Sequence, residues 1–273
     1  MEDMKSVQWL VARAAWPGIV SLSLVFAWGL LERGASPGAT ATFAFLFALA
    51  TTMAVERFGH GRAIDLAYLG LAALGQTMIK LLLGLALAPR AARSGLEWAV
   101  LALLLADLGK YWIHRLAHER AWLFRFHAEH HAPSEMYALN GVRMHPVNLA
   151  WNVALDVGVP MLLGLDGRAL VMVAVFRGAV SVLQHANAPL VLGPLNWMFS
   201  TPDLHRFHHS KVLREANSNY GSTLIVWDVL FGTRRCPLGT PAALGLSEDA
   251  PHPRRIARQL VWPWCRAPER CLD

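Results

Sequence analysis

Charge is scarce in this sequence of 273 residues. Asp, Glu, Lys and Arg make up 16% of it, whereas hydrophobic residues make up 55%. Soluble domains contain about a quarter charged residues, so this deficit argues against an ordinary soluble domain. It is typical of a protein that places much of its surface in a lipid bilayer.

Cysteine and common catalytic motifs are also rare or missing. Cys236, Cys265 and Cys271 lie near the C-terminus without C-x-x-C spacing, and their odd number indicates no disulfide framework. There is no G-x-G-x-x-G, no G-x-x-x-x-G-K-[ST] and no H-E-x-x-H. The sequence therefore lacks the usual signatures of dinucleotide binding, P-loop phosphate binding and zinc peptidases.

Apolar runs fill the N-terminal part of the chain. Four such runs are 14–31, 39–55, 66–88 (interrupted by Lys80) and 96–108, which carries Glu97 and Asp107. About 20 apolar residues cross a bilayer core, so we expect about four N-terminal spans. The first run is longer than a signal-peptide core, which favours an uncleaved anchor. Two weaker runs, 149–165 and 169–183, could form a second membrane hairpin, re-entrant helices or buried core.

The C-terminal tail is basic and rich in proline. The chain has a net charge of +6, and the tail includes "RQLVWPWCR", whose tryptophans suit a membrane interface. A cytoplasmic, lipid-facing tail and a partly disordered tail are both compatible with this composition. No binding motif accompanies the charge, so we expect no nucleic-acid partner.

Histidine is the unusual feature of the sequence. One H-x-x-x-H and two H-x-x-H-H boxes contain eight of the 12 histidines. On a helix, the spacings i, i+3 and i+4 bring side chains to one face. Imidazole suits Fe, Zn, Cu and Ni, and eight ligands are too many for one tetrahedral zinc but enough for two metals. The eight are His114, His118, His127, His130, His131, His205, His208 and His209.

Isolated polar residues near the boxes are weaker candidates. His145 and His185 could be additional ligands or ordinary core and turn residues. Asp107 lies on the helical stripe of His114 and could accept its second ring N–H, and Asp203 is a weaker candidate for the same role. Either acid could instead be an N-cap or helix-end residue.

Other polar residues are expected outside the site. Glu119 and Glu129 point to other helical faces, where we expect them to be solvated or paired with Arg115, Arg120 or Arg125. His60 and His252 stand among turn residues and charges. We therefore expect neither histidine to be a ligand.

Several segments together resemble one family. "HRLAH", "HAEHH", "RMHP", "QHAN", "LHRFHH" and "NYGSTLIVWDVLFGT" resemble the fatty acid hydroxylase/sterol desaturase superfamily of integral-membrane di-iron oxygenases. The resemblance is dense over 100–235. It implies an all-α fold, with polytopic membrane helices and a cytosol-facing helical cap that holds two irons. The eight box histidines would be ligands, His145 and His185 would complete the set, and Asn187 and Tyr220 match recurrent positions.

The resemblance also implies the chemistry. The enzyme would use O2 and two external electrons to hydroxylate a fatty acyl, sterol or aminolipid substrate; desaturation by the same site is the alternative. Zinc could replace iron during purification. The sequence has no H-P-G-G signature of a fused cytochrome b5 domain, so we expect a separate donor resembling cytochrome b5 or ferredoxin.

Two other functions fit less well. A histidine-rich metal transporter would carry its ligands inside the spans, whereas the boxes lie outside the uncharged runs. A zinc hydrolase would lack the general base of H-E-x-x-H.

The expected organisation has three regions in a bacterial inner membrane. Residues 1–95 would span the membrane, and 96–235 would be the catalytic region with further embedded helices. Residues 236–273 would be the basic, Pro-rich tail. The catalytic site and the C-terminus would be cytoplasmic. Under the positive-inside rule this side is supported by Arg57, Arg62, Lys110 and Arg115, whereas Arg90 and Arg93 argue mildly against it.

Overall fold

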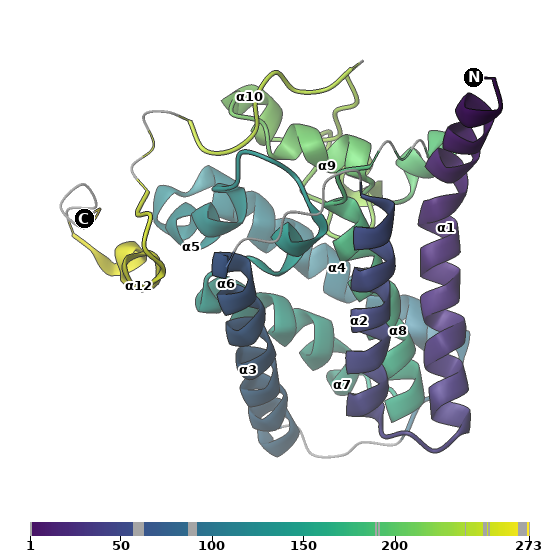
Figure 1. Ribbon diagram of the computed structural model, residues 1–273. Helices are drawn as coiled ribbons and strands as arrows, with labels where there is room; N and C mark the ends of the chain where they lie inside the picture. Colours follow the sequence, from purple (N-terminus) through teal and green to yellow (C-terminus); the bar gives the residue numbers. More distant parts are fainter. Residues whose placement is uncertain are drawn as a thin grey trace.

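The computed structural model describes residues 2–56, 63–86, 92–188, 190, 192–237, 239–247, 250, 252–266 and 272. Within these residues the fold is all-α, as expected, with a few isolated β-bridges and no extended strand. The long helices are α1 (Glu2–Glu32), α2 (Pro37–Val55), α3 (Ala63–Ala86), α4 (Leu96–Glu119) and α8 (Gly167–Gln184). They form a bundle in which α1, α2 and α3 run vertically in Figure 1 and α4 and α8 lie behind them.

Three described helices are long and apolar enough to cross a membrane. They are Arg13–Glu32 in α1, Pro37–Val55 (α2) and Gly167–Gln184 (α8). The first two coincide with the predicted runs 14–31 and 39–55, and the third is the weaker run 169–183. The predicted runs 66–88 and 96–108 are helical in α3 and α4, although 87–91 lie outside the described residues. The four-span count and the three-region division stay predictions.

Short polar caps define where the membrane helices begin. Ser36 accepts the Ala39 N–H and Pro37 follows at the first helical position, which suits the start of α2. Asp166 accepts the N–H groups of Arg168 and Ala169 and starts α8. Because α8 ends at Gln184, the next residue, His185, lies at the end of the bundle that carries the other histidines.

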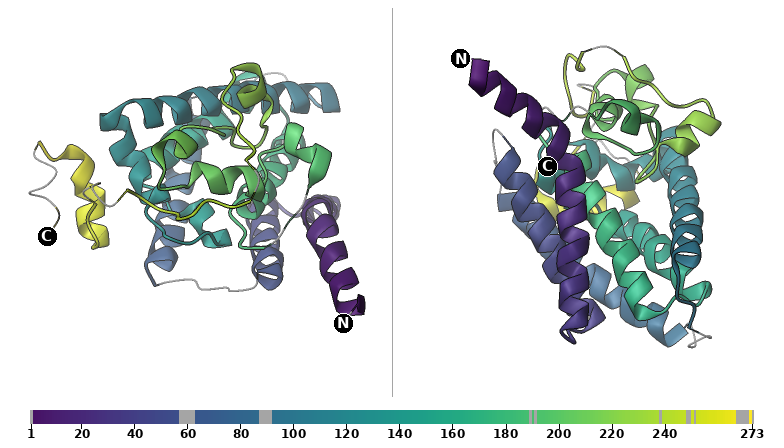
Figure 2. Two further views of the ribbon diagram at one scale, coloured as in Figure 1. Left: turned by 90° about the horizontal axis from the view of Figure 1, so that it is seen from above. Right: turned by 90° about the vertical axis from the view of Figure 1, so that its right-hand side faces the viewer.

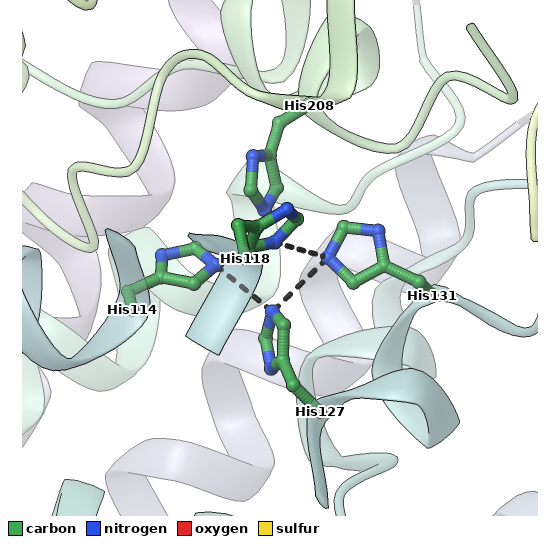
Figure 3. Close-up of side chains that lie close together, drawn as sticks. All are labelled: His114, His118, His127, His131 and His208. Atoms are coloured by element: carbon green, nitrogen blue, oxygen red, sulfur yellow. Dashed lines mark hydrogen bonds between the residues drawn. The ribbon is translucent and has the colours of Figure 1, made fainter. Parts of the chain in front are cut away.

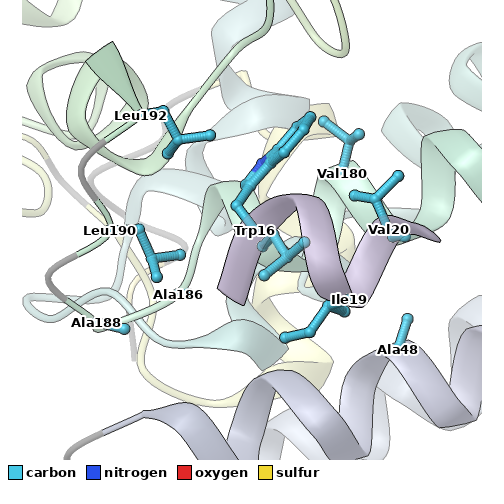
Figure 4. Close-up of a cluster of buried hydrophobic side chains, with 11 residues drawn as sticks. Trp16, Ile19, Val20, Ala48, Val180, Ala186, Ala188, Leu190 and Leu192 are labelled. Atoms are coloured by element: carbon cyan, nitrogen blue, oxygen red, sulfur yellow. The ribbon is translucent and has the colours of Figure 1, made fainter. Parts of the chain in front are cut away.

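Packing fixes the end of α8 against α1. Trp16, Ile19 and Val20 of α1 form one buried cluster with Val180 and Leu183 of α8. The chain that leaves α8 continues the cluster with Ala186, Ala188, Leu190 and Leu192, several of which surround Trp16 in Figure 4. This cluster anchors the segment that carries His185.

Short helices form a layer at one end of the bundle (Figure 1). Its helical elements are α5 (Ala121–His131), the 3-10 turn Ala138–Val142, the 3-10 turn Gly193–Trp197, α9 (Pro202–His208), α10 (Leu213–Ala216) and α11 (Val226–Leu230). Residues Pro146–Val153 (α6), the π-helical turn Ala154–Gly158 and Val159–Leu162 (α7) return along the bundle toward α8. The resemblance implied a helical cap that faces the cytosol, and the side of the membrane on which this layer lies stays a prediction.

The described part of the tail is folded. α12 (Ile256–Val261) and the turn Trp262–Trp264 stand at the side of the molecule opposite α1 (Figure 2). Trp262 is buried, whereas Trp264 is exposed. Cys236 is a free thiol and Cys265 is disulfide-bonded, whereas Cys271 lies outside the described residues.

Candidate metal centre

Nine histidines converge in two groups. The first group contains His114, His118, His127, His131 and His208, and the second contains His130, His185, His205 and His209. Within each group the candidate ligand nitrogens lie within 4.8 Å of one another. The groups adjoin, because the rings of His131 and His209 stack with centroids 4.4 Å apart. Together they have the composition of a two-metal site built between helices.

Each H-x-x-H-H box contributes to both groups. From α5, His127 and His131 (i, i+4) enter the first group and His130 enters the second. From α9, His205 and His209 enter the second group and His208 enters the first. Residues four apart leave a helix close to one direction, whereas the adjacent residue is turned by roughly 100°. The doubled histidine therefore divides each box between the two groups.

Hydrogen bonds at Nδ1 fix how the rings present Nε2. Nδ1 of His114 lies 2.7 Å from the Tyr220 carbonyl oxygen, and Nδ1 of His208 lies 2.8 Å from that of Ser218. A carbonyl oxygen only accepts, so in both neutral rings Nδ1 carries the proton and Nε2 a lone pair. Nδ1 of His127 is oriented in the same way by Oδ1 of Asn148, at 2.7 Å.

The Nε2 atoms crowd together in a way that a cation would explain. Nε2 of His127 lies 2.9 Å from Nε2 of His114 and 3.0 Å from Nε2 of His131 (Figure 3). The His114 and His127 nitrogens both carry lone pairs, so they repel each other unless a positive ion lies between them. Two nitrogens bound at right angles to one ion at about 2.1 Å lie about 3.0 Å apart. Nε2 of His208 is buried without a hydrogen-bond partner among the described residues. The first group therefore fits a transition metal.

Burial keeps these imidazoles neutral. Desolvation lowers the pKa of His127 to about 4, although the hydrogen bond that His127 donates to Asn148 acts to raise it, and desolvation likewise lowers the pKa of His185 to about 4. The pKa values of His130, His131 and His205 fall well below the usual range, first through burial and then through neighbouring histidines. Metal binding requires the neutral ring, so no proton has to be displaced at neutral pH.

Two amide side chains support the site and were missed by sequence reasoning. Asn148 contacts His127, and the amide nitrogen of Gln184 lies 3.0 Å from Nδ1 of His205. Gln184 also donates to Ser200 Oγ at 2.6 Å. The signal available in the sequence was an uncharged amide at the edge of an apolar run. Such outer contacts fix ring orientation in metal sites.

The structure does not place His145 with the other predicted ligands. His145 is the N-cap of α6, where its side chain accepts the Val147 N–H at Nδ1. Its Nε2 donates to the Leu260 carbonyl oxygen at 3.0 Å. Both ring nitrogens are therefore occupied by the backbone. Of the ten predicted ligands, the structure brings the other nine together.

The predicted acidic partners of the histidines lie elsewhere. Asp107 is buried and accepts the N–H groups of Thr223 and Leu224, both at 3.0 Å. It thus holds the loop after the last box, while the Tyr220 carbonyl takes the predicted place at His114. A buried carboxylate in an apolar helix takes the nearest N–H donors, and here two adjacent backbone amides supply them.

Asp203 and Asn187 also contact other residues. Asp203 interacts with Asn196 and Arg206, and the Asn187 N–H donates to Glu56. Neither residue is shown in contact with a histidine ring.

The glutamates beside the boxes behave differently from each other. Glu119 pairs with Arg115 at 2.7 Å, one of the pairings expected. Glu129 is instead fully buried, and its Oε1 lies 2.6 Å from Nε2 of His252. We expected Glu129 to be solvated or paired with Arg115, Arg120 or Arg125, and this prediction is wrong. The tail folds over this face of α5 and brings His252 to Glu129.

A cavity of about 50 Å³ reaches both groups. Histidines of each group line it, together with further side chains that are mostly polar: Lys110, Met144, Asn148, Trp151, Asn152, Ser181, Gln184 and Ser222. It places room for a small molecule beside both sets of nitrogens.

Comparison with known proteins gives one family. Residues 99–233 match the family described as fatty acid hydroxylase. Ornithine lipid hydroxylase OlsE of Rhizobium tropici is 38% identical over 167 residues, 61% of this chain and 50% of that protein. Alkylglycerol monooxygenase of Xenopus tropicalis is 31% identical over 135 residues, 49% of this chain and 29% of that protein.

A third relative carries a different name. A very-long-chain aldehyde decarbonylase of Oryza sativa subsp. indica is 30% identical over 133 residues, 48% of this chain and 49% of that protein. The chain thus spans half or less of the length of these relatives. No solved structure matches it.

Proposed function

Residues 99–233 belong to the fatty acid hydroxylase family, and on that premise we propose that the chain is a membrane-bound di-iron oxygenase that hydroxylates a C–H bond of a lipid. The observation that carries the proposal is the pair of adjoining histidine groups. Five and four neutral imidazoles, with a cavity that reaches both sets, match the needs of two metals acting on one small molecule.

The donor set fits iron. Imidazole suits Fe as well as Zn, Cu and Ni, whereas Mg and Ca prefer oxygen ligands. When bound, two irons would supply the reduction of O2 by two external electrons, with one oxygen atom entering the C–H bond and the other leaving as water. The nine clustered histidines would hold the metals. Asn148, Gln184 and the carbonyls of Tyr220 and Ser218 keep the rings in place.

The bundle supports access of a lipid from the bilayer. Leu66, Leu74 and Met78 of α3 and Leu101 and Leu105 of α4 are each at least 38% exposed, although α3 and α4 are not among the three candidate spans. Such apolar faces suit contact with acyl chains. We infer that α3 and α4 also cross the membrane, which gives four N-terminal spans and puts the histidine layer on the cytoplasmic side of a bacterial inner membrane.

The substrate class follows from the names of the relatives. One acts on an ornithine lipid and another on alkylglycerol, according to those names. A lipid is therefore the substrate to test here. The electrons would come from a separate protein resembling cytochrome b5 or ferredoxin, which would dock at the cytoplasmic face.

Isotope labelling during turnover tests the proposal. Purified protein expressed with ample iron would be analysed for Fe and Zn and then supplied with reductant, lipid extract and ¹⁸O2. We expect about two irons per chain and a lipid product that carries ¹⁸O. A lipid that has lost two hydrogens without gaining ¹⁸O would assign desaturation instead.

The control variants separate the metal site from the rest of the chain. Changing His130 and His208 to Ala should remove the metal and the product, whereas His60→Ala, which lies outside the boxes, should change neither. Stoichiometric zinc in every preparation, with activity only toward esters, would overturn the oxygenase proposal.

A further inference from the structure

The tail forms a strap against the helix that carries the first H-x-x-H-H box. We call residues 252–266 the C-terminal strap. Nε2 of His252 contacts Glu129 on α5, and Nη1 of Arg125, also on α5, donates to the Cys265 carbonyl oxygen at 2.9 Å. The rings of Phe126 and Trp264 meet edge to face, with centroids 5.0 Å apart. The strap thus contacts α5 near its middle and near its end.

The strap is also bonded to α3 and to the start of α6. Tyr68 of α3 donates to Oε1 of Gln259 at 3.1 Å, and Gln259 is only 2% exposed. His145 donates to the Leu260 carbonyl oxygen. Contacts with α3, α5 and the start of α6 therefore hold the inner face of the strap in one place. The side chains on its outer face consequently point in a fixed direction.

The outer face combines positive charge with apolar side chains. The strap contains four arginines and no acidic residue, and Arg254, Arg255, Arg258 and Arg266 are all exposed. Beside them, Val261 is 49% exposed and Trp264 is 67% exposed. Exposed Trp and aliphatic side chains beside arginines are the composition of segments that lie in the headgroup region of a bilayer.

The position of the strap along α3 agrees with that composition. Gln259 bonds to Tyr68, in the first turns of α3, next to Leu66, which is 63% exposed. Further along the same helix, Leu74 and Met78 are 63% and 52% exposed. The strap therefore stands where the apolar outer face of α3 begins, at one side of the molecule (Figure 2).

We propose that the C-terminal strap binds the surface of an anionic bilayer, with its arginines on phosphate headgroups and with Val261 and Trp264 at the acyl boundary. Charge complementarity and continuity with the apolar face of α3 select lipid as the partner. A lipid-bound strap would brace α5, which carries His127, His130 and His131. This proposal depends on membrane embedding but not on the metal or the reaction.

A fluorescent probe on the strap tests the proposal in the full-length protein. Val261→Cys, in a background in which Cys236, Cys265 and Cys271 are changed to Ser, would be labelled with an environment-sensitive dye, so that position 261 carries the single reactive thiol. The protein would be placed in nanodiscs of phosphatidylcholine, with or without phosphatidylglycerol. We expect a blue shift and stronger emission in the anionic discs, reversed by high salt, because exposed charge pairs are screened.

Arginine variants and a matched probe complete the test. Changing Arg254, Arg255 and Arg258 to Gln should weaken the response about fivefold per arginine, since each contributes about a kilocalorie per mole near an anionic surface. A probe at Leu213→Cys, 70% exposed on α10, should not respond to phosphatidylglycerol.

Two results would overturn the lipid assignment. One is emission at Val261 that is the same in both kinds of disc and unchanged by the arginine substitutions. The other is a probe that stays water-exposed in both discs but responds to an added acidic electron-transfer protein, which would assign the strap to a protein partner. Because metal-free protein can be used for every measurement, these outcomes are independent of whether the chain is an oxygenase.

Discussion

The two histidine groups differ in ligand number and in how they meet the cavity. The first has five histidines from α4, α5 and α9, and two of them line the cavity. The second has four, and three of them, His130, His185 and His205, line it. Nδ1 of His130 is also buried without a hydrogen-bond partner among the described residues. The second group therefore presents a larger share of its histidines to the cavity than the first does.

Single alanine substitutions at His130 and His131 should have the largest effect and test the difference between the two groups most directly. The rings belong to different groups although the residues are adjacent, so His131→Ala should weaken the first metal and His130→Ala the second. Each change should lower activity by more than about 100-fold, because even outer contacts of metal sites cost about 10- to 100-fold.

Metal analysis with Mössbauer spectroscopy would show whether the two variants lose different irons. Two retained metals and full activity in His130→Ala would contradict the division into groups. The same spectrum in both single variants would indicate one shared site instead.

Acid should lower the folding stability of the protein through histidines of both groups. The pKa values of His127, in the first group, and His185, in the second, are lowered to about 4 by burial, whereas an unfolded histidine titrates near 6.5. Below about pH 6.5 the unfolded chain takes up protons that the folded chain does not, so stability is complete above that pH and falls toward pH 4. Each ring contributes roughly 3 kcal/mol to this loss.

Denaturant unfolding of metal-free protein at pH 7 and pH 5 would measure the loss. A midpoint that is equal at the two pH values would mean that the rings are not buried as described. A His185→Gln variant should show a smaller pH dependence than the unchanged chain.

The side-chain amides of Asn148 and Gln184 allow the metal affinity of each group to be tested separately. Asn148→Leu removes the partner of His127 in the first group, and Gln184→Leu removes the partner of His205 in the second. Each should lower the affinity for its own metal by about 10- to 100-fold. Asn152→Leu is the matched control, because Asn152 lines the cavity and donates to Met144.

Competition with a chelator would measure metal retention in these variants. Equal retention in all three would show that the amides do not orient the rings.

Sequence reasoning predicted the elements that have a local signal. Apolar runs gave the membrane helices, and histidine spacing gave eight residues that the structure gathers, with the resemblance adding His185. The i, i+3, i+4 pattern did not show that each box divides between two groups, because that depends on how α5 and α9 face each other. Asp107 was assigned to His114 from its stripe on α4, but it contacts Arg177 and two backbone amides more than a hundred residues away.

Substitution of His145 should have the smallest effect on metal content. It tests whether the position of a histidine in the fold, rather than its place in the sequence, decides that it binds metal. Both His145 and His185 are isolated histidines near apolar segments, yet His185 follows α8 inside the second group while His145 caps α6 and bonds to the strap. His145→Ala should therefore keep two metals per chain and cost about 1 kcal/mol of stability through the lost cap. His145→Asn should restore most of that cost, because Asn is a good N-cap, whereas neither Asn nor Ala at 185 should restore the second metal. Loss of metal in His145→Ala with unchanged thermal stability would instead return His145 to the ligand set, and the strap would then have to move to free its ring.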